Sequence, residues 1–128
     1  MANKARGEVT VSIGEESYTL RPTFEAMEQI EDKLKLGIPE LVDKFSRGEV
    51  QIREVVTILH EGIVAQSGGK RHEVLSRSEL GAQVLSAGLM GIIKQPAMIR
   101  FLLHGIAGDK KMESAGEPTP VPPERTET

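Results

Sequence analysis

The chain has 128 residues, enough for one domain and too few for two of ordinary size. It contains no cysteine, which excludes disulfides, thiolate catalysis and cysteine-bound zinc, and which fits a reducing cytoplasm. The formal net charge of −3 lacks the basic excess of a domain that neutralises many phosphates, so nucleic-acid binding is disfavoured. The sequence contains no apolar run long enough for a membrane span and no signal peptide is expected.

The first predicted element is a β-hairpin. Apolar and polar residues alternate on both sides of residues 14–17, which have the composition of a turn. We expect Ile13 to lie opposite Tyr18 across this turn. Val11 would then lie opposite Leu20, with all of these side chains on one face. Because a lone hairpin is only marginally stable in water, this face should pack against helices.

Three helices are expected next. The first begins after Thr23, a residue that can cap it, and ends at Gly37. The second begins near Pro39 and ends at Gly48, and the third covers residues 52–65. The predicted apolar stripe of the first helix consists of Phe24, Met27, Ile30 and Leu34.

A capping box marks the start of the fourth helix. Ser76 and Glu79 have the spacing at which each side chain can bond to a backbone N–H near the other residue. Leu75 and Leu80 flank them as a hydrophobic staple. These features predict a helix over residues 77–87.

The last predicted helix, from about Pro96 to Ala107, has an unusually wide apolar arc. At 100° per residue its apolar side chains spread over roughly 200°, which is more than one core-facing stripe needs. Either the helix is central and covered on two sides, or part of it is a contact surface. We expect Met98 and Phe101 to lie at its exposed edge and to bind a partner protein, because methionine suits adaptable binding surfaces.

The composition changes after Gly108. Residues 109–128 contain Pro118, Pro120, Pro122 and Pro123 and little to bury, so we expect a disordered tail there. Residues 1–108 would form a single domain. The expected fold class is α+β, with an N-terminal β-hairpin packed on a bundle of about five short helices.

Two short motifs resemble known chemical signatures, but both lack required residues. Gly68-Gly69-Lys70 resembles the end of a phosphate-binding loop, but Val64 and Arg71 stand where glycine and Ser or Thr are needed. His60-Glu61 resembles the start of a zinc protease motif, but Val64 again replaces the second histidine. We therefore predict no catalytic residue, no cofactor and no metal site, and we expect that the protein is not an enzyme.

A small DNA-binding regulator is an alternative, because Lys70, Arg71 and Arg77 precede the fourth predicted helix. That helix lacks the Arg and Asn side chains that read base edges. A solvated basic loop is the simpler interpretation of the three cations.

Three stretches, residues 7–31, 36–41 and 55–63, resemble the tail protein family of gene transfer agents, and the similarity covers about residues 7–108. The resemblance implies a role in the assembly of a long phage-type tail. Chaperones of this class coat the tape measure protein and bring tail tube subunits to it. The family label is also attached to the tail tube itself. Tube subunits are typically β-rich, whereas this sequence predicts one hairpin and several helices, which favours the chaperone.

The resemblance therefore implies a tail assembly chaperone that binds the tape measure and tail tube proteins and does no covalent chemistry. Self-association is a further expectation. The protein would act in the cytoplasm of the bacterial host cell and be absent from the mature particle. A structural tail tube component and a DNA-binding regulator are the alternatives.

Overall fold

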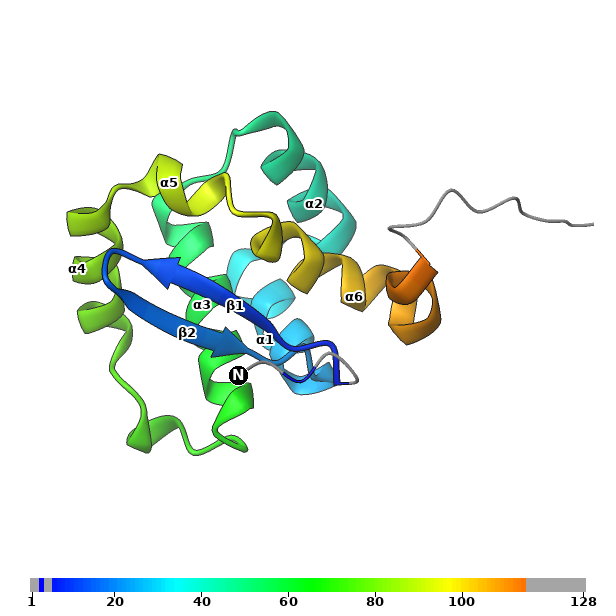
Figure 1. Ribbon diagram of the computed structural model, residues 1–128, viewed down its shortest axis with the longest axis horizontal. Coiled ribbons are helices and arrows are strands. Elements are labelled where there is room, and N and C mark those ends of the chain that lie inside the picture. Colours follow the sequence, from blue (N-terminus) through cyan, green and yellow to red (C-terminus); the bar gives the residue numbers. More distant parts are fainter. Residues whose placement is uncertain (1–2, 4–5, 115–128) are drawn as a thin grey trace, which may run out of the picture.

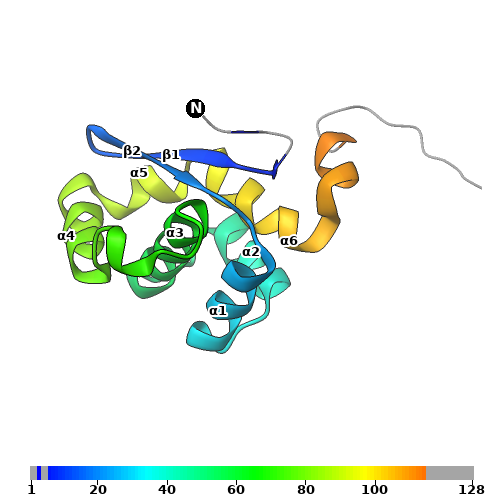
Figure 2. The same ribbon diagram turned by 90° about the horizontal axis from the view of Figure 1, so that it is seen from below.

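The computed structural model describes residue 3 and residues 6–114, with residues 108–114 described by their backbone alone. A two-stranded antiparallel sheet lies over a layer of helices (Figure 1), and Figure 2 shows this layering from the side. The arrangement confirms the expected α+β class, with an N-terminal hairpin packed on short helices. In chain order the elements are β1 (Val9–Ile13), β2 (Glu16–Leu20), α1 (Phe24–Leu34), α2 (Ile38–Arg47), α3 (Ile52–Gln66), the 3-10 helix η2 (Arg71–Glu73), α4 (Arg77–Ala87), α5 (Leu89–Ile93) and α6 (Pro96–Ser114).

The hairpin turn is tighter than the sequence predicts. Gly14 has a φ of +64°, a conformation that glycine adopts easily, and it allows a two-residue loop between the strands. Val11 therefore lies opposite Tyr18, and Ile13 lies opposite Glu16. The expected register, with Ile13 opposite Tyr18, was wrong by two residues. Because a shift of two residues keeps each side chain on its face, the apolar side of the hairpin still packs on the helices.

The helix ends around α1 were predicted in part. The Thr23 side chain accepts a hydrogen bond from the Ala26 N–H at 3.1 Å, which confirms the predicted cap. The helix ends at Leu34 and is capped by Lys35, whose φ is +58°, while Gly37 is the extended residue that precedes α2. The expected end at Gly37 was therefore wrong. Phe24 was expected in the buried stripe, but it is 73% exposed because the first residue of α1 points away from the core.

The predicted capping box at the start of α4 is confirmed. Ser76 Oγ accepts from the Glu79 N–H at 3.1 Å, and Glu79 Oε1 accepts from the Ser76 N–H at 2.8 Å. Leu80 is fully buried and Leu75 packs against the same core. The sequence signal therefore placed the start of this helix correctly.

The central element of the fold is α3. It packs against α1, β2 and α4, and every residue from Glu54 to Ala65 is buried. Gly62 allows β2 to approach closely, because a Cβ built there would lie 2.7 Å from Leu20 Cβ. At the same place the Arg21 N–H donates to the Gly62 carbonyl at 3.1 Å, which joins the end of β2 to α3.

The wide apolar arc of α6 is explained by burial on two sides. The helix packs against both α2 and β1. Met98 and Phe101 are fully buried, as is Leu102. The expectation that Met98 and Phe101 lie at an exposed edge was therefore wrong, and the alternative of a centrally packed helix describes this segment. The partner contact expected of these two residues has lost its basis.

Helix α6 also extends further than predicted. Its backbone remains helical to Ser114, whereas the sequence analysis expects the helix to end near Ala107. Residues 109–114 are thus the helical end of α6, in keeping with the good helix propensity of lysine, methionine and glutamate. The rest of the expected tail, residues 115–128, lies outside the described residues.

Candidate functional site

Four polar side chains are buried along α3, and each is bound by a residue from another part of the chain. We call them the α3 polar row: Glu54, Thr57, His60 and Glu61. Buried polar groups are costly unless they are paired, so their partners determine what the row can do.

Glu61 is bound by two cations. Its carboxylate accepts from Lys33 Nζ at 2.6 Å and from the two terminal nitrogens of Arg71 at 2.9 and 3.1 Å. Burial alone would raise the pKa of Glu61, but the hydrogen bonds from Arg71 and Lys33 together outweigh it and lower the pKa below its ordinary value. Glu61 is therefore an ionised acceptor near neutral pH and is unsuited to act as a general acid.

The other members of the row are paired in the same way. Glu54 accepts from Lys44 Nζ at 2.7 Å, and the Thr57 hydroxyl accepts from Arg77 Nη2 at 2.7 Å. His60 lies with Nε2 3.0 Å from the carbonyl oxygen of Leu75, the geometry of an N–H donor to that carbonyl. Burial lowers the pKa of His60, which keeps its ring neutral at physiological pH.

These contacts explain two features that the sequence left open. Arg71 and Arg77, two of the three cations considered for DNA binding, are used inside the fold to bind Glu61 and Thr57. His60-Glu61, the partial zinc motif, belongs to this polar row. The sequence alone does not reveal such pairings, because Lys33 and Glu61 lie 28 residues apart in the chain. The signal that the sequence does offer is the presence of charged residues in the otherwise apolar segment that forms α3.

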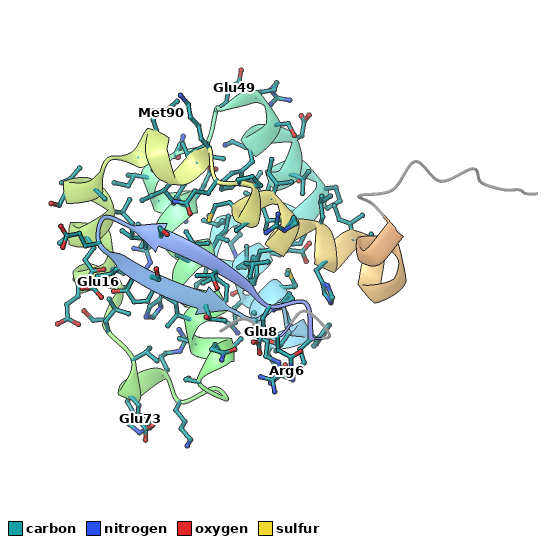
Figure 3. All side chains as sticks on the ribbon, viewed as in Figure 1. Arg6, Glu8, Glu16, Glu49, Glu73 and Met90 are labelled. Carbon is teal, nitrogen blue, oxygen red and sulfur yellow. The ribbon has the colours of Figure 1, made fainter. Side chains whose placement is uncertain are left out.

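A third buried carboxylate, Glu8, lies just before β1. Glu8 accepts from Arg6 Nε at 2.9 Å and from the Asn3 N–H at 2.8 Å. Burial alone would raise the pKa of Glu8, but the hydrogen bonds from Asn3 and Arg6 lower it overall. Figure 3 shows Arg6 and Glu8 next to each other at this end of the sheet. Like Glu61, the group is ion-paired and suited to fixing the chain rather than to chemistry.

A hollow of about 550 Å³ lies beside the polar row. It is bounded by the start of α1, the end of α3 and the loop before η2, and we call it the α1–α3 hollow. Its lining includes Arg21, Thr23, Gln29, Glu61, Gly69 and Arg71. Two of the charged groups that line the hollow, Glu61 and Arg71, form an ion pair with each other. Within the described residues, the lining holds no histidine and no cysteine beside the Thr23 hydroxyl.

In the part of the chain that the structure describes, no group of three or more His, Cys, Asp or Glu side chains gathers in a way that could hold a metal ion. None of the described helices is both long and apolar enough to cross a membrane.

Comparison with known proteins gives one match. The model of the family described as phage tail tube protein, GTA-gp10, matches residues 6–94, which is more than half of the chain and includes the hairpin, α1 to α5 and the α3 polar row. No curated protein and no solved structure matches the chain. The match confirms the resemblance to tail proteins of phages and gene transfer agents, and its description names the tail tube rather than an assembly chaperone. The chain belongs to the family described as phage tail tube protein, GTA-gp10.

Proposed function

We propose that this protein is a tail assembly chaperone, which binds the tape measure protein and the tail tube protein by reversible contacts while a phage-type tail is built. Membership in a family of tail proteins supports a role in the tail. The finer choice of a chaperone rests on the surface of the molecule.

The observation that carries this choice is that the large exposed apolar side chains come from different helices, one from each. Subunits of a permanent tube contact neighbours on several sides, and such obligate interfaces are large and more apolar than ordinary surface. In the described part of the chain each large exposed apolar residue lies on a different helix: Phe24, Ile52, Leu85, Met90 and Ile106. This surface suits a protein that binds and releases its partners. Over the described residues the sheet has only two strands, which provides little material for a β-rich tube wall.

A tail tube component is the second candidate, and the description of the matching family favours it. A DNA-binding regulator has less support, because Arg71 and Arg77 are engaged within the fold. Binding to DNA would show a steep dependence on salt concentration, which an anisotropy titration measures.

The deciding experiment is quantitative mass spectrometry of purified mature particles beside the lysate in which they assemble. A chaperone should be abundant in the lysate and missing from the particle, whereas a tube component should be present in the particle in many copies. Co-expression with the tape measure protein, followed by pull-down, tests the partner. Retention in the particle at the level of a tube subunit would contradict the chaperone proposal.

A further inference from the structure

The two outer edges of the hairpin differ in how their backbone groups are used. On β1, the Ser12 N–H donates to Gln95 Oε1 at 2.9 Å, and Gln95 Nε2 donates back to the Ser12 carbonyl at 2.6 Å. The Glu8 N–H donates to the Asn3 carbonyl at 3.1 Å. The only remaining outward-facing residue of β1 is Thr10. The Gln95 amide thus imitates a neighbouring strand and closes this edge.

The edge of β2 is open by comparison. The backbone N–H and C=O of Ser12 point away from β2. In an antiparallel pair the backbone groups of the opposite residue then point away from β1, so those of Ser17 do, and so do those of Thr19 two residues later. Arg21 is the next residue whose backbone points outward, and its N–H donates to the Gly62 carbonyl. Within residues 6–114, no hydrogen bond from another element reaches the backbone of Ser17 or Thr19. In Figure 2 no other ribbon is drawn across this edge of the sheet.

The sequence along this open edge is complementary to itself. Residues 15–21 begin with two glutamates and end with an arginine. If two copies paired antiparallel about Tyr18, Ser17 of each copy would lie opposite Thr19 of the other, and the outward N–H and C=O groups would be satisfied. The acidic end of each strand would then lie beside the basic end of its partner, which favours this register.

The α1–α3 hollow of one copy offers a binding place for the acidic end of residues 15–21 of the other copy. Arg21 lies at the end of β2 and lines the hollow, and within the described residues it forms no ion pair. In the antiparallel arrangement the exposed hairpin turn of one copy, which carries Glu15, would approach this end of the other copy. Arg21, whose charge acts at a distance on the buried Glu8, would thereby gain a carboxylate in direct contact.

We propose that the open edge of β2 binds the same edge of a second copy of this chain, forming a four-stranded sheet in a two-fold symmetric dimer. The pairing extends a marginal two-stranded hairpin to a sheet of ordinary size. The proposal is independent of the function proposed above, because a chaperone and a tube component could each associate in this way.

Charge reversal followed by mixing tests the arrangement. Sedimentation velocity of the full chain over a wide concentration range should show a dimer. Glu15→Arg and Arg21→Glu should each weaken dimerisation on the order of tenfold, because each places like charges at both symmetric contacts. An equimolar mixture of the two variants should restore it, since every contact then joins opposite charges. The control is Glu49→Arg, which lies just after α2 and away from β2 in Figure 3, and which should leave the dimer unchanged.

Single cysteines give an independent measurement of register, because the natural chain has none. Ser17→Cys mixed with Thr19→Cys should form a disulfide-linked heterodimer faster than either variant alone. Thr10→Cys on β1 lies on the same face of the sheet and serves as the control, with little cross-linking expected. Circular dichroism melts of each variant confirm that it is folded.

Three results would overturn the proposal. One is a chain that stays monomeric at every concentration, which would leave the edge to a strand of another protein. Another is a dimer that neither charge reversal weakens. The third is a dimer in which Thr10→Cys cross-links as readily as the mixed pair, because the contact would then lie elsewhere.

Discussion

Helices α3 and α4 are neighbours, yet their burial is the reverse of what their charges suggest. α3 carries several charged residues and is buried without interruption over Glu54–Ala65. α4 carries no charge after Glu79, but it buries only Leu80 and Val84 and leaves Leu85 73% exposed. The difference teaches that position in the fold decides burial here. A central helix can carry charges when neighbouring elements supply partners, and an end helix can leave apolar residues in solvent.

The largest effect that we predict tests the partners of α3. In the double variant Lys33→Met and Arg71→Met, the Glu61 carboxylate stays buried but loses the cations that bind it. We expect a loss of about 3–5 kcal/mol in the free energy of unfolding, which is the usual result of leaving a buried charge unpaired. Chemical denaturation at pH 7 measures it. The control is Lys35→Met, since the Lys35–Asp32 pair is exposed and should contribute little.

In the same variant, the contribution of Glu61 to stability should depend on pH with the opposite sign to that in the natural protein. In the natural protein the pKa of Glu61 is lowered, so its contribution to stability is present above the unfolded-state value of about 4.5 and is lost as the pH falls through the folded-state pKa. Without the two cations, burial remains and raises the pKa. The penalty of the charged carboxylate is then relieved as the pH falls from neutral through that raised pKa. The variant should thus recover stability relative to the natural protein on mild acidification. A parallel pH profile for both proteins would contradict the pairing.

These pairings mark the limit of what the sequence could predict. Local signals were sufficient for the capping box at Ser76, because both partners lie within one helical turn. They were not sufficient for the partners of Glu61, since contacts between distant segments depend on how the helices pack. The prediction that Met98 and Phe101 are exposed failed for the same reason. A wide apolar arc shows how much of the helix must be covered, but not whether the rest of this chain or a partner covers it.

The second prediction compares one substitution in the two helices. Gly62→Ala in α3 places a Cβ 2.7 Å from Leu20 Cβ, so β2 and α3 must move apart. Overpacking costs about 1–3 kcal/mol and the better helix propensity of alanine returns up to about 1 kcal/mol, so we expect a net loss of about 1–2 kcal/mol. Gly81→Ala in α4 meets no atom within 4 Å and should stabilise the protein by about 0.5–1 kcal/mol. Thermal melts should therefore shift in opposite directions. Shifts of the same sign would show that α3 and β2 are not in close contact.

The third prediction concerns the cap of α4. Ser76→Ala removes the acceptor for the Glu79 N–H and should lower the free energy of unfolding by about 1 kcal/mol. Ser78→Ala is the matched control, because Ser78 lies inside the same helix and is exposed. It should leave the denaturation midpoint unchanged or raise it slightly. Equal effects of both substitutions would argue that the helix begins elsewhere.

The smallest predicted effect is that of Leu85→Gln on the exposed face of α4. Leu85 is 73% exposed and glutamine is a good helix former, so the free energy of unfolding should change by no more than about 0.5 kcal/mol. The matched substitution Leu59→Gln in α3 replaces a fully buried leucine and should destabilise the protein by at least about 2 kcal/mol. Melting both variants at two protein concentrations adds a further test. If Leu85→Gln were strongly destabilising and the melting temperature of the natural protein rose with concentration, α4 would be covered by another molecule in solution. Its burial would then resemble that of α3, and the contrast between the two helices would hold only for the isolated chain.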